Sequence, residues 1–423
     1  VSVQKGNNVS VNGEAPLSLT LDGKDPQSCQ FLSKRAADES HEFTWKEVTT
    51  TRGGELAEIL GDQLRSVDSL VVKGYVNDKD FHAMWDASLY GYLSVINLKN
   101  AVLENNAVPD TAFFHENEQY EGSSHEIFYY IGLRKIILPE GLEKIGEGAF
   151  YQASALRQVN FPSTLRYIGD FAFNATKLEM NQLVIPEGVE EINQYAFAFC
   201  RKLKAQVTLP STIKKIGEWA FYGCPITSIN LPEGLESLGS LAFWDCDLRE
   251  VSIPSSCHEF NEGWQFGFNR NLEKMHLPEG MTEIPDHFAV DCFRLREVNF
   301  PHTLKHIGEK AFSLCISLKN VDLPLGMQSL GEEAFSELEA LEQIVFPASM
   351  KSLGKNSCSY WKNIKRIYCA AIEPPVCDPT DGGVFSGFDF PDGLNTPVVY
   401  VPKGSINKYK DTSRNCMGWE KFW

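Results

Sequence analysis

The sequence predicts a right-handed, β-rich solenoid in which short repeats stack around a parallel sheet. Three observations support this fold class. Prolines recur every 22–24 residues from Pro139 to Pro347. The residues before each proline alternate between apolar and polar, and in most repeats an Ala-Phe pair follows ten residues after the proline. A fixed period of this size is typical of proteins built from stacked coils.

The period divides the 423 residues into four segments. Residues 1–50 are polar and mixed in pattern, and we assign them no structure. Residues 51–130 are predicted to form an N-terminal helical cap with irregular repeats, and 131–368 hold the regular repeats. Residues 369–423 are predicted to form a C-terminal β cap, with a last strand at 397–401 followed by an aromatic helix or turn.

The N-terminal segment contains one helical pattern and two irregular coils. Leu56, Ile59, Leu60 and Leu64 recur at helical spacing, so we expect a helix over 54–65 that covers the open end of the core. Strand patterns follow at 67–72 and 93–98. Phe128 stands where the first Ala-Phe corner is expected.

Each regular repeat begins with a strand and a turn. Leu133, Ile136 and Leu138 are apolar and spaced for one buried face, and Pro139 then ends the strand because proline cannot donate to the ladder. The pair after each proline alternates between Glu-Gly and Ser-Thr or Ser-Ser over most of the array, which suggests duplication of a two-coil unit.

A glycine follows the second apolar anchor in most repeats, beginning with Gly146, and asparagine replaces it at Asn193. This exchange predicts a left-handed backbone at that position. Pro285 occupies the same position in one repeat and cannot adopt a positive φ, so we expect a different turn there.

The Ala-Phe pair is predicted to form a short helical or 3-10 turn at a corner of the coil. Its phenylalanines should stack into a spine that fills the interior. Four cysteines lie three residues after such a phenylalanine, and a fifth lies nearby, so we interpret them as buried, inert thiols: Cys200, Cys224, Cys246, Cys315 and Cys292. Pairing of Cys369 with Cys377 is left open.

Composition and motifs exclude several classes of function. The net charge is −17 and no Lys/Arg cluster interrupts it, so a nucleic-acid partner is not expected. No apolar run approaches the ~20 residues of a membrane span. No catalytic or phosphate-binding motif stands in a suitable context. His302 and His306 are four residues apart, which would suit a metal pair on a helix, but they follow a strand proline, so the spacing does not indicate a metal site. We expect no metal, no cofactor and no catalytic residues.

Two sets of side chains are candidates for binding. Gln182, Gln206 and Asn230 belong to the outward positions of the predicted sheet, which are rich in amides and hydroxyls. Solenoid faces often bind partners, although a solvated sheet would look the same. Tyr222, Trp244 and Trp264 follow the corner, where large aromatics favour an interface or else pack between coils.

The repeat unit L-P-E-G-L-E-K-I-G-E-G-A-F, residues 138–150, resembles the BspA-type leucine-rich repeat of Bacteroides-like bacteria. The tail Y-V-P-K-G-S, Y-K and W-E-K-F resembles the closing segment of such proteins, and the resemblance covers about residues 55–423. It implies a leucine-rich repeat solenoid at the cell surface or secreted. It also implies a lipoprotein, with an anchor upstream of residue 1, that binds proteins and in some cases adheres to host extracellular matrix.

The functional hypothesis that follows is a non-catalytic surface protein that recognises a protein partner. A carbohydrate-binding module is the first alternative, because aromatic side chains also stack on sugars. A structural spacer is the second alternative.

Overall fold

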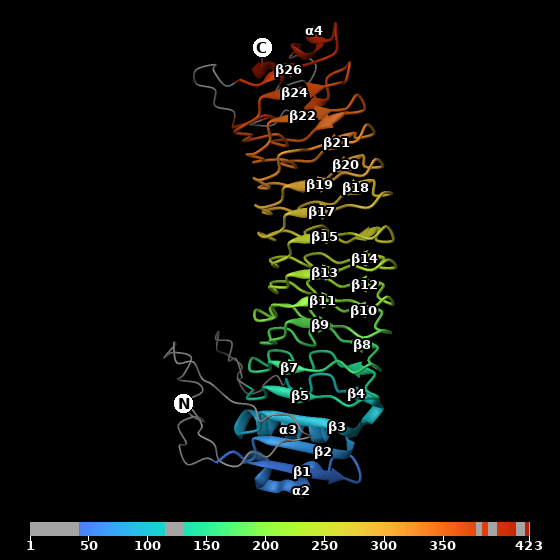
Figure 1. Cartoon of the computed structure of the whole chain (residues 1–423), viewed down its shortest axis with the longest axis vertical. Helices are drawn as coiled ribbons and strands as arrows, with labels where there is room; N and C mark the ends of the chain where they lie inside the picture. The colour runs from blue at the N-terminus through green and yellow to red at the C-terminus, as the bar shows by residue number, and fades with distance from the viewer. Residues whose placement is uncertain (1–41, 115–130, 378–382, 388–395, 412–418, 423) are drawn as a thin grey trace, which may run out of the picture. The chain divides into compact units, whose positions relative to one another are not determined.

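The computed structural model describes residues 42–114, 131–377, 383–387, 396–411 and 419–422. The chain divides into two units, Val1–Thr44 and Trp45–Trp423. The second unit is a solenoid of about 13 coils, each stacked on the one before it (Figure 1). The predicted solenoid with parallel strand pairing is confirmed.

One row of strands contains the segments that precede the prolines. It is divided into sheets of five, three, three and three strands, and each pairing is parallel. Inward residues such as Ile136 and Leu183 are fully buried. The strands are β1 (Trp45–Thr50), β2 (Ser69–Val76), β3 (Val95–Leu103), β5 (Lys135–Ile137), β7 (Gln158–Val159), β9 (Gln182–Val184), β11 (Gln206–Thr208), β13 (Ser228–Asn230), β15 (Glu250–Ser252), β17 (Lys274–His276), β19 (Glu297–Asn299), β22 (Gln343–Phe346), β24 (Arg366–Cys369) and β26 (Val398–Tyr400).

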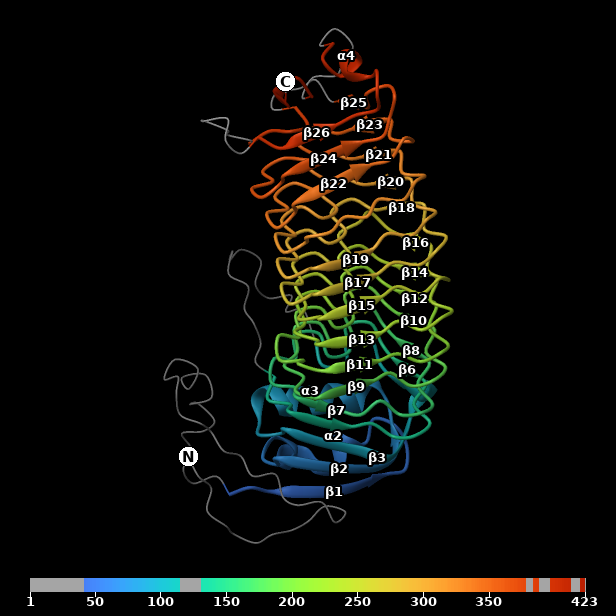
Figure 2. The same ribbon diagram turned by 45° about the horizontal axis from the view of Figure 1, so that its top comes forward.

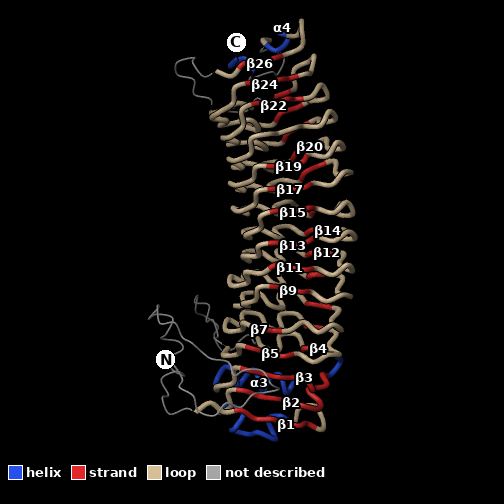
Figure 3. Tube along the Cα trace, viewed as in Figure 1, coloured by secondary structure: helices blue, strands red, loops and turns tan. Residues whose placement is uncertain are grey.

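A second row of two-residue strands, absent from the sequence-based prediction, follows the turn after each proline. It forms sheets of seven and five strands. Figures 2 and 3 show the two rows side by side along the unit. The strands are β4 (Ala107–Val108), β6 (Lys144–Ile145), β8 (Tyr167–Ile168), β10 (Glu191–Ile192), β12 (Lys215–Ile216), β14 (Ser237–Leu238), β16 (Glu259–Phe260), β18 (Glu283–Ile284), β20 (His306–Ile307), β21 (Ser329–Leu330), β23 (Ser352–Leu353) and β25 (Val376–Cys377).

The turns that follow the prolines are joined in pairs. The Glu187 carboxylate accepts hydrogen bonds from the Ser211 N–H (3.1 Å) and hydroxyl (3.0 Å) of the next coil. Thr212 Oγ1 accepts from the Gly188 N–H (2.9 Å) and donates to the Val189 carbonyl (2.8 Å). We call such a joined pair of turns a two-coil clasp. Equivalent carboxylate contacts join Glu140 to Ser163, Glu233 to Ser255 and Glu279 to His302. The alternation of Glu-Gly with Ser-Thr therefore has a structural basis.

The remainder of each regular coil is a run of tight turns, called here the turn side. The Ala149 and Tyr151 N–H groups donate to carbonyls three residues earlier, as in a 3-10 turn. Between them, Phe150 and Gln152 donate to carbonyls of the next coil instead. The predicted short helical turn is therefore present only at alternate residues, and the other N–H groups bind coil to coil.

Gly146 and its equivalents do not have the predicted left-handed backbone. Positive φ falls two residues later, for example at Tyr195 (55°) and Trp219 (57°). At Gly146 itself, a Cβ would lie 2.5 Å from the Asp110 nitrogen of the preceding coil, so the absence of a side chain permits the close approach in that coil. Since the position has no positive φ, Pro285 fits it without a different turn, and His287 keeps the usual φ of 55°. Both predictions about this position were wrong.

The predicted phenylalanine spine is confirmed. Seven buried rings stack with centroids 5.2–5.6 Å apart and planes within 11° of parallel: Phe113, Phe150, Phe173, Phe197, Phe221, Phe243 and Phe266. The stack is interrupted in the next coil, where the order is reversed to Phe288-Ala289 and the Phe266 and Phe288 planes meet at 76°. It resumes between Phe312 and Phe335.

The N-terminal end of the solenoid carries most of the described helix. The expected helix over 54–65 is α2 (Leu56–Leu60) followed by the 3-10 turn η1 (Gly61–Arg65), but Ile59 is exposed. The longer helix α3 (Asp78–Tyr90) and strand β1 are additional elements. Phe113 begins the spine, and η2 (Glu104–Asn106) and β4 precede it in the same coil. Phe128, where the sequence placed the first corner, lies outside the described residues.

The C-terminal strand is β26, within the predicted 397–401. It is followed by α4 (Ile406–Tyr409) and the 3-10 turn η4 (Trp419–Phe422). Trp419 is buried and its ring packs on Phe385 and Tyr409 at 4.9 and 5.3 Å. That the two terminal segments act as caps stays a prediction.

Candidate functional site

The six candidate binding residues lie in two groups on different parts of the coil. Gln182, Gln206 and Asn230 are outward residues of β9, β11 and β13. Tyr222, Trp244 and Trp264 lie on the turn side, after the corner or in its irregular counterpart. The structure brings together the members of each group, but it does not join the two groups into one site.

The first group forms a polar surface across three adjacent strands. Gln182 and Gln206 are register partners, and Asn230 is the partner of Thr208. All three amides are exposed, and none makes a hydrogen bond to any residue that the structure describes. We call this surface the amide zone, defined by the outward residues Gln182, Val184, Gln206, Thr208, Ser228 and Asn230.

Other outward amides on the same row are used internally. Asn160 Oδ1 accepts from the Leu138 N–H (2.7 Å) and its Nδ2 donates to the Leu138 carbonyl (3.0 Å), and Asn299 binds Leu277 in the same way. These side chains add coil-to-coil hydrogen bonds at the residue that follows β5 and β17. The amides of the amide zone differ because their donors and acceptors are available to a partner.

Charge separates the amide zone from the strands that follow it. On β15, β17 and β19 the outward residues include charged groups in contact, with Lys274 Nζ 3.4 Å from Glu297, and His276 Nε2 lies 3.2 Å from the Glu250 carboxylate. The amide zone itself has no charged side chain. On a protein with a net charge of −17, it is a neutral surface rich in hydrogen-bonding groups.

The aromatic candidates are packed against their own coil neighbours. Trp264 stacks on the His287 imidazole at 3.6 Å with planes 8° apart, and Trp244 packs on Trp264 at 5.1 Å. The Trp244 ring also covers Gly267, where a Cβ would lie 2.1 Å from it. All three aromatic candidates are half-buried, including Tyr222, which packs on Trp219 at 4.3 Å.

This packing bears on sugar recognition. Stacking on a sugar requires an exposed ring face, and the neighbouring rings cover much of the faces in this row. The same holds for Phe171, Tyr195 and Trp219, which stack on one another at 4.7 and 5.2 Å. Burial also lowers the pKa of His287, so its ring is neutral when it stacks on Trp264 near pH 7.

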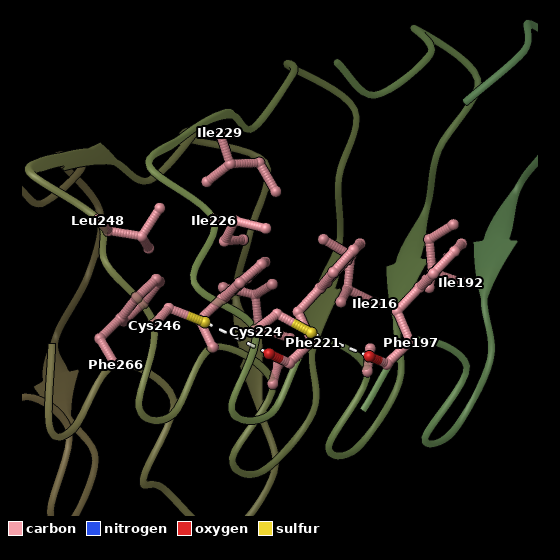
Figure 4. Close-up of a cluster of buried hydrophobic side chains, with 14 of the residues drawn as sticks. Ile192, Phe197, Ile216, Phe221, Cys224, Ile226, Ile229, Cys246, Leu248 and Phe266 are labelled. Atoms are coloured by element: carbon pink, nitrogen blue, oxygen red, sulfur yellow. Dashed lines mark hydrogen bonds between the residues drawn. The ribbon is translucent and has the colours of Figure 1, made fainter. Parts of the chain in front are cut away.

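The five cysteines after the corner are buried, as predicted, and they also form hydrogen bonds. Cys224 donates to the Phe197 carbonyl (2.9 Å) and Cys246 donates to the Phe221 carbonyl (3.3 Å), which Figure 4 shows as successive steps. Asn269 and Trp361 occupy the same column and donate to the Phe243 and Phe335 carbonyls, both at 2.7 Å. These residue types share the capacity to donate a hydrogen bond to a carbonyl of the preceding coil.

Burial makes these thiols poor nucleophiles. It raises the pKa of Cys292 to about 12 and the pKa values of Cys224 and Cys315 well above the usual range. Cys369 and Cys377 are likewise buried and neither forms a disulfide, so the pairing that the sequence left open is not present.

The two histidines considered as a metal pair bind other groups. His302 Nδ1 lies 3.0 Å from Glu279, and His306 Nδ1 lies 2.6 Å from the Ser329 hydroxyl. Within the described residues, no three His, Cys, Asp or Glu side chains are arranged to hold a metal ion. The helices of the described ranges include none that is long and apolar enough to cross a membrane.

Comparison with known families identifies the repeat. The chain matches the BspA-type leucine-rich repeat region in six copies, at residues 123–206, 204–308 and 287–372. No curated protein matches the chain.

Several solved structures resemble the chain. A leucine-rich repeat protein from Bacteroides ovatus is 23% identical, with 71% of this chain and 82% of that chain covered and a TM-score of 0.46. A leucine-rich cell surface protein from Faecalibacterium prausnitzii is 18% identical, with coverage of 78% and 90% and a TM-score of 0.37. A leucine-rich repeat protein from T. pallidum is 30% identical over 37% of this chain and 76% of that chain, with a TM-score of 0.35.

Proposed function

The chain belongs to the BspA-type leucine-rich repeat family, and from this we propose that it is a non-catalytic cell-surface protein that binds another protein through the amide zone. Leucine-rich repeats serve as protein-interaction scaffolds, because stacked coils present an extended, regular surface. The proposal includes an extracellular partner, such as a host matrix protein, and export of the chain to the surface.

One observation carries the choice of surface. Gln182, Gln206 and Asn230 are exposed on neighbouring strands and bind no described residue, so their amides are available to a partner without loss of internal contacts. Each amide can both donate and accept, which suits the backbone and polar side chains of a protein. The half-buried aromatics on the turn side give no comparable support to a glycan site.

The test is a parallel screen of the purified chain against extracellular-matrix proteins and glycans. We expect saturable binding to a protein. The double variant Gln182→Glu/Gln206→Glu should weaken this binding about tenfold or more, because it replaces two amides, which donate hydrogen bonds, with carboxylates, which only accept them. Gln343→Glu is the matched control, since Gln343 is an exposed glutamine of β22 outside the amide zone. Glycan binding without any protein ligand, or equal effects of both variants, would refute the proposal.

A further inference from the structure

A shallow groove lies at the N-terminal end of the solenoid, beside the C-terminal ends of strands β2 and β3. These two strands pair as far as Val76 with Leu103, whereas β1 ends opposite Gly74 and β5 ends opposite Asn97. The projecting ends border two adjoining hollows of about 420 and 280 Å³, which share Asn77 and Glu104 in their walls.

The larger hollow has an exposed apolar floor. Tyr75 and Val102 are register partners on β2 and β3, and both line it. Their exposed fractions are 56% and 52%, unlike the half-buried aromatics of the turn side. Two adjacent apolar side chains that remain exposed at a concave surface favour a site that an apolar group of a partner covers.

Among the charges that line the groove, Glu104 has no counterion within the described part of the chain. Arg52 is paired with Glu55 and Glu58 at 3.0 and 3.2 Å, and Lys144 with Asp110 at 3.3 Å. Glu104 is exposed between the two hollows and makes no ion pair or side-chain hydrogen bond with the described residues. Asp78, a further carboxylate of the wall, faces His82 at 3.5 Å. The groove is therefore complementary to a positive charge.

We propose that this groove binds an extended segment of a partner protein in which an aliphatic side chain lies next to a lysine or arginine. The aliphatic group covers Tyr75 and Val102, and the cationic group pairs with Glu104. A neutral glycan would leave Glu104 without a counterion, and a phosphate-bearing surface would be repelled by it. The site is independent of the amide zone, because its strands belong to a different sheet.

The probe is a fluorescein-labelled peptide of repeated Gly-Leu-Lys, compared with the matched Gly-Leu-Glu peptide by fluorescence anisotropy at low salt. We expect saturable binding of the lysine peptide alone. Glu104→Gln and Tyr75→Ser should each raise the Kd about tenfold. The control variants Glu190→Gln and Val345→Ser, which change an exposed carboxylate and a 49% exposed valine elsewhere, should leave the Kd unchanged.

Three results would overturn the proposal: no saturable binding, equal binding of the two peptides, or equal losses in the groove and control variants. Circular dichroism of each variant verifies the fold, and the conservative Glu104→Gln change is informative even if Tyr75→Ser folds poorly. The double variant Gln182→Glu/Gln206→Glu should bind the peptide as the wild type does, so failure at one surface is distinguishable from failure at the other.

Discussion

The column of buried donors after the corner shows what single residues contribute to this fold. Spacing from the phenylalanines was enough to predict that the cysteines are buried. It could not predict that Asn269 and Trp361 share their role, because an amide, an indole and a thiol differ in size and polarity. Their common feature is a bond to a carbonyl of the preceding coil, which is visible only once the coils are stacked.

The Cys292 thiol predicts how stability depends on pH. Its folded pKa of about 12 lies above the ~8.5 of an unfolded thiol, so the folded state holds its proton over a range in which the unfolded state releases it. The free energy of unfolding should therefore fall as pH rises between these two values. The slope is at most about 1.4 kcal/mol per pH unit for each such thiol.

The measurement is denaturant unfolding at a series of alkaline pH values. Cys292→Ser removes this titration, so its stability should fall less steeply than that of the wild type. Identical slopes in the two proteins would show that the Cys292 thiol is not protected by burial.

The regular strands were predictable because each has an inward residue at every second position and a proline at its end. The second row of strands was not, since a two-residue strand such as β10 has no alternation to detect. The start of helix α3 is marked in the sequence by its capping residues and not by apolar periodicity. Asn77 and Asp80 form a capping box at its start, a pattern that marks a helix N-terminus.

The two-coil clasp predicts a difference between two threonines. Thr212 binds the Gly188 N–H and the Val189 carbonyl, so Thr212→Val should cost about 1–3 kcal/mol through the loss of these bonds. Thr208→Val, on the exposed face of β11, should change the free energy of unfolding by less than about 0.5 kcal/mol. Chemical denaturation of both variants checks this, and equal effects would mean that the clasp contributes nothing to stability.

For the solenoid unit, repetition made the fold predictable, but it did not indicate which surfaces bind a partner. The sequence could not select the binding residues, because an outward side chain looks the same whether it bonds to the neighbouring coil or is available to a partner. Asn160 and Asn230 illustrate this: both are outward asparagines two residues before a proline, but only the first binds the neighbouring backbone. The groove at Tyr75 and Glu104 depends on strand lengths that differ from the repeat, so the period contained no indication of it.

The phenylalanine spine links the coils, and its removal at one point should be costly. Phe221 is fully buried between Phe197 and Phe243, with ring centroids 5.3 and 5.6 Å away. Phe221→Ala should lower the free energy of unfolding by about 3–5 kcal/mol, because the stacked neighbours cannot collapse into the cavity. Phe221→Leu, the control, should cost less. A loss below about 1 kcal/mol for the alanine variant in denaturant titrations would contradict the role given to the spine.

The two-coil clasp also restricts which insertions and deletions the array can tolerate during evolution. Removing two coils, from Pro186 to the residue before Pro232, leaves each remaining Glu-Gly turn beside a Ser-Thr or Ser-Ser turn. Removing one Ser-Thr coil would place two Glu-Gly turns in succession and leave the first carboxylate without its serine donor, whereas removing one Glu-Gly coil would leave a Ser-Thr turn without its carboxylate partner. Natural variants of this chain that differ in length should therefore have gained or lost coils in even numbers.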